Sequence, residues 1–191
     1  PNLCTSCGIC VGACPTSTPF RRAEELSTGI DLPDFSLADL RSATERAAGR
    51  LGTSGPRVLV FGCDHGAALD GLAQGAVRLP CVGMLPPPFI DYALARGLAD
   101  GIVLAGCAEG SCHFRHGIRW TEDRIASRRD PYLRARVPRE RIATVWAGPS
   151  GRRLLARELD RFRARLEPLA PAPSDESALR VGREGQAASD D

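Results

Sequence analysis

The spacing of apolar residues predicts alternating strands and helices after residue 55. Short apolar runs typical of buried strands stand at 57–63, 76–81, 101–107 and 142–147. A helix is expected over 89–96, and a last helix begins near Ser150 with an apolar face of Leu155, Leu159, Phe162 and Leu166. Strands that alternate with helices form parallel sheets covered on both sides. We therefore expect an α/β fold with a small open parallel sheet and helices on both faces.

One further helix is predicted upstream of this region. Ser36 and Asp39 have the spacing of a capping box, and apolar residues follow them at helical intervals. Gly52 is expected to stop this helix. It would lie within an otherwise irregular linker.

Composition indicates an ordinary soluble protein that contains a metal centre. Of 191 residues, 43% are hydrophobic and 25% charged, and no apolar stretch approaches the roughly 20 residues of a membrane span. No signal peptide is visible, so we expect a reducing cytoplasmic location, where eight cysteines favour metal over disulfides. All 25 basic residues are arginine, and they are densest over 113–165. We interpret that stretch as a solvated face or as a docking face for an acidic redox partner.

The first cysteine group has the spacing of a bacterial ferredoxin. Cys4, Cys7, Cys10 and Cys14 form the run C-x2-C-x2-C-x3-C, followed by Pro15. This spacing predicts a [4Fe–4S] cluster, because three thiolates three residues apart turn onto one cube. Zinc sites more often pair C-x2-C with a distant second pair.

The ferredoxin spacing leaves two arrangements open. In two-cluster ferredoxins the fourth cysteine binds the other cube, so the partner ligands would lie upstream of Pro1 and the run would be half a ferredoxin domain. A single cube held by all four cysteines is the alternative. We expect the chain to be a piece of a longer protein.

The second cysteine group follows the predicted strands. Its members are Cys63, Cys81, Cys107 and Cys112. The first three end strands, and the carboxyl ends of parallel strands share one edge of the sheet. Four thiolates at one edge suit a [2Fe–2S] cluster or zinc, and nearby glycines would permit close approach of an inorganic core. Cys63 and Cys107 as merely buried apolar residues are the alternative.

Several stretches between about 57 and 166 resemble the delta subunit of methyl-viologen-reducing hydrogenases. They are Cys81-Val-Gly, 99–107, Gly110-Ser-Cys112-His113-Phe with Gly117, Arg124, and 138–142 with Trp146. The resemblance implies a [2Fe–2S] cluster held by Cys63, Cys81, Cys107 and Cys112. It also implies electron transfer between partner subunits, such as a flavoprotein or subunits of a hydrogenase or heterodisulfide reductase. The family opens with C-x2-C, whereas Gly66 stands here at the second position.

These interpretations divide the chain into four parts. They are a ferredoxin-type segment over 1–19, a linker with one helix over 20–55, a delta-subunit-like domain over 56–167 and a disordered tail over 168–191. Fusion of the first part to the third resembles larger bacterial proteins, which would place a membrane and a quinone upstream. The chain would then lie at the cytoplasmic face of that membrane.

The remaining polar residues indicate no catalytic set. His65, His113 and His116 stand near cysteines and are expected to tune a cluster from outside its ligand shell or to lie on the surface. The first hypothesis is thus an electron-transfer module with two clusters and no substrate turnover of its own. The second is a zinc-stabilised regulatory or nucleic-acid-binding protein that uses the arginines, although few aromatic residues are interleaved with them.

Overall fold

The four apolar runs form one open sheet in the computed structural model, which describes residues 4–14 and 29–169. All neighbouring strands pair in parallel, in the order β2-β1-β3-β4. The strands are β1 (Val58–Cys63), β2 (Ala76–Leu79), β3 (Gly101–Gly106) and β4 (Ile142–Trp146). The predicted α/β fold with a small parallel sheet is confirmed.

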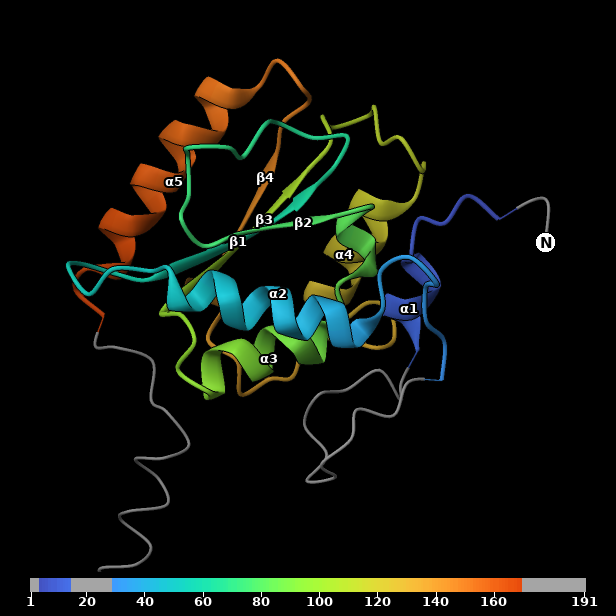
Figure 1. Cartoon of the computed structure of the whole chain (residues 1–191), viewed down its shortest axis with the longest axis horizontal. Coiled ribbons are helices and arrows are strands. Elements are labelled where there is room, and N and C mark those ends of the chain that lie inside the picture. Colours follow the sequence, from blue (N-terminus) through green and yellow to red (C-terminus); the bar gives the residue numbers. More distant parts are fainter. Residues whose placement is uncertain (1–3, 15–28, 170–191) are drawn as a thin grey trace, which may run out of the picture.

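Helices cover both faces of this sheet, as Figure 1 shows. They are α1 (Ile9–Ala13), α2 (Leu37–Gly49), α3 (Pro87–Ala95), α4 (Gly117–Ile125) and α5 (Arg152–Leu166). The helices α2 and α3 share one core with the sheet, and α5 packs on the opposite face. The short helices α1 and α4 both contact η1 (Val82–Met84), a 3₁₀ turn that follows β2.

Burial on both faces explains why the strands are continuous apolar runs. Leu59 and Phe61 of β1 enter the core beneath α2 and α3, whereas Val58 and Val60 pack toward α5. Successive strand residues point to opposite faces, so a strand covered on both sides requires an apolar residue at nearly every position. The fully buried strand β3 alternates between the same two cores.

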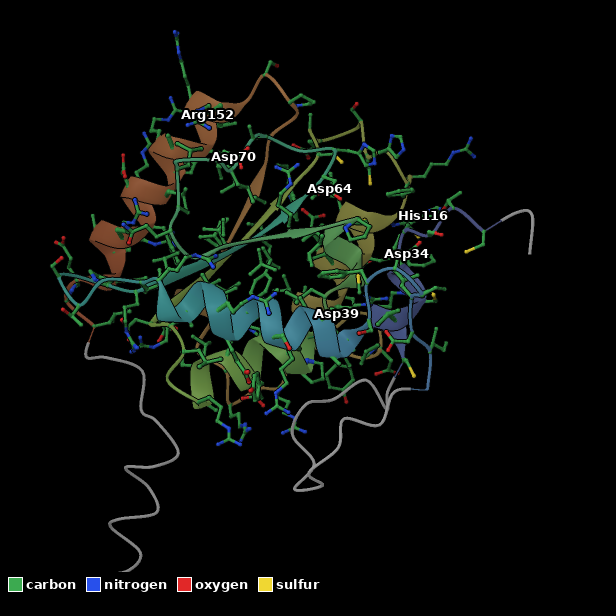
Figure 2. All side chains as sticks on the ribbon, in the orientation of Figure 1. Asp34, Asp39, Asp64, Asp70, His116 and Arg152 are labelled. Carbon is green, nitrogen blue, oxygen red and sulfur yellow. The ribbon has the colours of Figure 1, made fainter. Side chains whose placement is uncertain are left out.

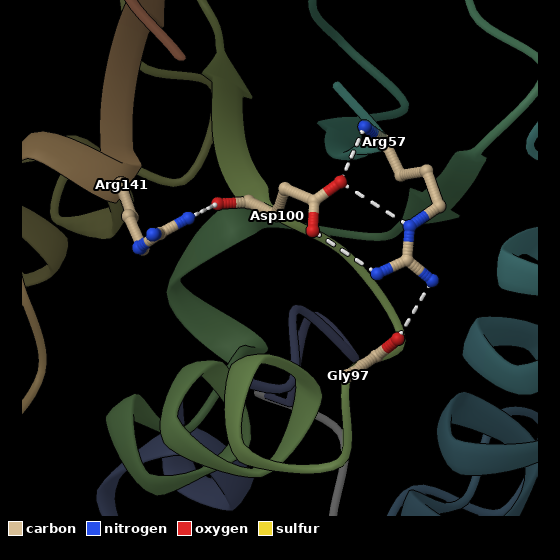
Figure 3. A network of polar contacts seen from close by, with 4 residues as sticks. All are labelled: Arg57, Gly97, Asp100 and Arg141. Carbon is tan, nitrogen blue, oxygen red and sulfur yellow. Dashed lines mark hydrogen bonds and ion pairs between the residues drawn. The ribbon is translucent and has the colours of Figure 1, made fainter. Parts of the chain in front are cut away.

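A polar network fixes the amino ends of the strands (Figure 3). The Asp100 carboxylate accepts hydrogen bonds from the backbone N–H of Arg57 at 2.9 Å and from its guanidinium at 3.0 and 3.2 Å. Arg57 also donates to the Gly97 carbonyl, and Arg141 donates to the Asp100 carbonyl at 2.9 Å. Because these residues precede β1, β3 and β4, the network holds three strands in register at the end opposite the cysteines.

The predicted capping box is present at α2. Ser36 Oγ accepts from the Asp39 N–H at 3.1 Å, and Asp39 Oδ2 accepts from the Ser36 N–H at 2.9 Å. The helix ends at Gly49, a little before the expected stop at Gly52. The helix α3 starts at Pro87, two residues earlier than expected, because proline is tolerated in a first helical turn.

Two parts of the predicted domain organisation fall outside the described residues. Residues 15–28 belong to the end of the ferredoxin-type segment and to the linker, and 170–191 make up nearly all of the predicted tail. Among the residues that the structure does describe, no helix combines the length and the apolar character needed to span a bilayer.

Candidate metal centre

Two cysteines meet where the order of the strands reverses. The chain runs from β1 outward to β2 and returns to β3 on the other side of β1, which makes the carboxyl ends of β1 and β3 a topological switch point, where open α/β sheets bind ligands. Cys63 ends β1 and Cys107 follows β3, and their Sγ atoms lie 3.6 Å apart. Metal–sulfur bonds of about 2.3 Å in a tetrahedral site place two sulfurs roughly 3.8 Å apart. The pair is therefore spaced like two ligands of one metal atom.

The other two predicted ligands adjoin this pair. Cys81 lies two residues after β2, and its thiol forms a hydrogen bond with Cys63. Gly117, the first residue of α4, supports both remaining sulfurs: a Cβ added there would overlap Cys81 Sγ and would lie 3.4 Å from Cys112 Sγ. The structure thus brings together all four cysteines of the second group. We call them the rim cysteines.

Backbone N–H groups point at the sulfurs of the rim cysteines. Cys63 Sγ accepts from the N–H groups of His65 and Val82. Cys81 accepts from the N–H of Gly83, and Cys107 accepts from that of His113. Donors of this kind stabilise thiolates and tune the potentials of iron–sulfur clusters. His65 and His113 therefore interact with the rim sulfurs through their backbone N–H groups.

Shared protons and burial shift the pKa values of these thiols in opposite directions. A hydrogen bond from Cys81 lowers the pKa of Cys63 to about 5, against the opposing effect of burial. The same hydrogen bond, together with burial, raises the pKa of Cys81. Burial raises the pKa of Cys107 to about 11. At neutral pH Cys63 is therefore the thiolate of the group, and metal binding there would release protons.

The first cysteine group is much more open. Cys4 and Cys10 are exposed, while Cys7 and Cys14 are half-buried. Cys10 lies on α1, which begins after Gly8 in the left-handed conformation with a φ of 74°. Across residues 4–14 and 29–169, no group of three or more His, Cys, Asp or Glu side chains is arranged to hold a single metal ion.

Several glycines near the rim cysteines make room for other protein atoms. A Cβ on Gly62 would meet Leu69, and one on Gly106 would meet the Trp146 ring at 2.6 Å. Gly66 packs on a backbone carbonyl oxygen and Gly110 faces open space. Gly62, Gly66 and Gly106 therefore make room for protein atoms, whereas Gly110 adopts the left-handed conformation, with a φ of 72°. Gly117, which sequence reasoning singled out only through the family resemblance, is the glycine that leaves room for sulfur.

The three histidines lie at the surface around the rim. The exposed rings of His65 and His113 stack with centroids 3.6 Å apart. His116 stacks on Trp120 at the start of α4, on the same side of the molecule as Asp64, which follows β1 (Figure 2). The rings of His65 and His113, together with Phe114, thus form an aromatic border to the thiol site.

Several arginines of the 113–165 stretch are structural. Arg141 belongs to the network of Figure 3, and Arg136 pairs with the buried carboxylate of Asp91 at 2.7 Å. Arg124 is 1% exposed and donates to the Gly83 carbonyl at 2.8 Å. Composition does not distinguish such residues from a solvated face, because arginine serves both purposes.

A family match covers the half of this chain that contains three of the four rim cysteines. The family model described as methyl-viologen-reducing hydrogenase, delta subunit, matches residues 73–170. An iron-sulfur subunit of the F420-non-reducing hydrogenase of Archaeoglobus profundus is 32% identical over 95 residues, which cover 50% of this chain and 69% of the relative. An iron-sulfur subunit of the F420-non-reducing hydrogenase vhc of Methanococcus voltae is 31% identical over 74 residues, 39% of this chain and 51% of that protein.

A longer match joins this chain to a larger protein. One subunit of the ferredoxin:CoB-CoM heterodisulfide reductase of Methanosarcina mazei is 26% identical over 150 residues, 73% of this chain but only 18% of the relative. The family match at 73–170 includes Cys81, Cys107 and Cys112 and begins after Cys63. Its extent, and the coverage of the Archaeoglobus protein, show that the chain belongs to the methyl-viologen-reducing hydrogenase delta subunit family.

Proposed function

We propose that this chain is an electron-transfer component of an oxidoreductase complex, with a [2Fe–2S] cluster bound by Cys63, Cys81, Cys107 and Cys112. One observation carries the proposal: four thiols from the segments that follow β1, β2 and β3 meet at the strand-order reversal, two of them 3.6 Å apart. Cys63 and Cys107 also pack in an apolar cluster with Ile118, but packing does not require a thiol at all four positions. Thiolates at this spacing are ligands for iron–sulfur clusters and for zinc.

The surroundings of the rim cysteines favour a cluster over zinc. The sulfurs of Cys63, Cys81 and Cys107 all accept backbone N–H groups. Hydrogen bonds to sulfur set the potential of a redox centre, whereas zinc has no redox chemistry to tune. The Archaeoglobus and Methanococcus relatives are also proteins whose names specify iron–sulfur.

For the first cysteine group we propose a [4Fe–4S] cluster bound through Cys4, Cys7, Cys10 and Cys14. The support is the ferredoxin spacing together with the placement of the thiols on a loop and a short helix, where Cys4 and Cys10 are exposed and Cys7 and Cys14 are half-buried. Either arrangement of the fourth ligand is compatible with the position of Cys14, which is half-buried directly after α1. An upstream ferredoxin half would supply the missing ligands in the two-cube arrangement.

The clusters would serve as one-electron carriers. The residues of the chain would hold them in place and set their reduction potentials. The rim lies beside an exposed aromatic border of His65, His113 and the half-buried Phe114. We propose this border as the side from which a redox partner approaches. A flavoprotein or subunits like those of hydrogenases and heterodisulfide reductases would be such partners, in the cytoplasm or at a membrane's cytoplasmic face.

Metal analysis of anaerobically purified protein tests this function. We expect a brown protein with iron and acid-labile sulfide in equal amounts, and a [2Fe–2S] EPR signal after reduction. A colourless protein with stoichiometric zinc would reject the proposal. Zinc together with DNA binding that weakens steeply with salt would instead support the zinc-stabilised nucleic-acid-binding hypothesis.

A further inference from the structure

Arg124 is a buried cation with incomplete hydrogen bonding. It extends from α4, and its side chain is enclosed almost completely, with 1% of the residue exposed. Nη1 donates to the Gly83 carbonyl at 2.8 Å and Nη2 to the Ile9 carbonyl at 3.4 Å. Its Nε–H is buried without an acceptor among the described residues. Gly83 lies in the turn after Cys81, and Ile9 is the first residue of α1.

The charge of Arg124 needs an anion nearby. Burial is the main cause that lowers its pKa to about 10, and the neighbouring charge of Arg129 adds to the effect. The guanidinium therefore stays protonated at neutral pH. Within the described residues its hydrogen bonds go only to carbonyl oxygens, and a buried cation without a counter-charge is costly. The electrostatic effect of Cys81 on this pKa has the opposite direction, so Arg124 lies close enough to the rim cysteines to interact with charge at their site.

Three glycines bring the two cysteine groups together beside Arg124. A Cβ on Gly12 of α1 would overlap the Gly83 carbonyl oxygen and lie 2.8 Å from Arg124 Nη1. A Cβ on Gly83 would lie 3.2 Å from the Cα of Gly117, which in turn supports the sulfurs of Cys81 and Cys112. The backbone of α1, which carries Cys10, is thus separated from the rim sulfurs by one turn of chain and one glycine.

We infer that Arg124 is a positioning residue that clamps α1 onto the turn after Cys81 and places one positive charge between the two cluster sites. This inference rests on the proposed function for its electrostatic part. The clamp sets the distance across which one electron leaves one centre and arrives at the other, with no bond or proton changed. A fixed positive charge favours the more negative, reduced state of a nearby centre and so raises its potential.

Replacement of Arg124 by methionine or lysine separates the two roles. Arg124→Met keeps a long apolar stem and removes both the charge and the hydrogen bonds, whereas Arg124→Lys keeps the charge but loses the two-pronged contact. Arg119→Met, on the same helix with a 79% exposed side chain, is the matched control. The measurements are a redox titration of the rim EPR signal and hydrogen exchange of the α1 amides, both on the metal-loaded chain.

The two variants should differ in the midpoint potential of the rim centre and should show the same change in hydrogen exchange of the α1 amides. At the wild-type midpoint, Arg124→Met should reduce the ratio of reduced to oxidised rim centre by about tenfold, equivalent to about 59 mV for one electron. Arg124→Lys should keep the wild-type ratio. Both variants should accelerate exchange at Gly12 and Cys14, whose N–H groups bond within the α1 turn, while Arg119→Met changes neither readout.

Distinct results would overturn the inference or the function beneath it. An Arg124→Met protein with the wild-type ratio and wild-type exchange rejects the inference. If Arg124→Met does not fold, the lysine variant decides alone: wild-type exchange at α1, or a tenfold loss in the reduced ratio, rejects it. Wild-type protein without iron rejects the proposed function, and the exchange measurement on that protein still decides whether the clamp exists.

Discussion

The two cysteine groups differ in how much of their geometry the polypeptide builds by itself. Cys63, Cys81 and Cys107 are buried at the ends of paired strands, and their sulfurs contact one another. Cys4 and Cys10 lie exposed on a loop and a five-residue helix. The sheet brings the thiols of the second group together, whereas the first group has no sheet beneath it.

The difference follows from what holds each backbone in place. The ladder between β1 and β3 and the network around Asp100 fix the strands that carry Cys63 and Cys107. Little chain entropy is therefore lost when metal binds there. A five-residue helix is too short to be stable alone, so α1 depends on its contact with η1. The rim cysteines are thus the group whose positions the fold sets in advance.

The largest expected effect comes from removing one rim thiol. Cys112→Ser should abolish the [2Fe–2S] EPR signal of the reduced protein, because a hydroxyl is a poor substitute for a thiolate on iron. Cys112 is only half-buried in a loop, so the substitution should leave the fold intact. Anaerobic EPR with iron analysis, and circular dichroism for the fold, provide the measurement.

The matching change in the open group should leave the rim untouched. Cys10→Ser is expected to remove the [4Fe–4S] signal and to preserve that of the [2Fe–2S] cluster. Loss of both signals in Cys10→Ser would show that the rim is not preorganised. An unchanged rim signal in Cys112→Ser would remove that cysteine from the ligand set.

A smaller effect is expected from Gly117→Ala, which tests the space left for the rim sulfurs. The added Cβ would overlap Cys81 Sγ, and overpacking of this kind costs about 1–3 kcal/mol. If that cost falls on the loaded site, cluster affinity drops by roughly 5- to 150-fold. Competition with a chelator, followed by the visible spectrum, measures the loss.

Gly49→Ala is the control, because a Cβ at Gly49 meets nothing within 4 Å. It lies at the end of α2, where alanine is favoured over glycine by up to about 1 kcal/mol. Cluster retention should therefore equal that of the wild type. A Gly117→Ala protein that holds its cluster as tightly as Gly49→Ala would contradict the role given to Gly117.

The sequence predicted those features whose causes lie within a few residues. The capping box of Ser36 and Asp39 is local, and a buried strand such as β1 is recognisable because non-polar residues occupy all of its positions. Placement of Cys63 and Cys107 at one edge followed from parallel pairing alone. The helix α1 was missed because five residues hold little more than one turn, too few for a helical period to show.

The roles of Gly117 and Arg124 depend on contacts across the chain. Arg124 meets a carbonyl 115 residues away, and Gly117 is recognisable as a sulfur support only once Cys81 lies against it. Arginine in an arginine-rich stretch gives no signal of burial, since nearly all such residues are solvated. The family resemblance includes both residues without indicating what either one contacts.

The smallest expected effect lies at the start of α2, close to the open cysteine group. Ser36→Ala removes an N-cap and should lower the free energy of unfolding by about 1 kcal/mol.

The Ser36 hydroxyl is also the main cause that lowers the pKa of Asp39, so the variant should raise that pKa toward its ordinary value. A carboxyl whose pKa is lowered by folding stabilises the folded state at pH values above its ordinary pKa. This stabilisation is lost as the pH falls through the lowered pKa. The difference in free energy of unfolding between the wild type and Ser36→Ala should therefore become smaller below about pH 4. Denaturant unfolding at neutral and acid pH, with an NMR titration of Asp39, tests this expectation. The rim EPR signal should stay unchanged, and its loss would mean that the rim depends on the region around α1 and α2 as much as on the sheet.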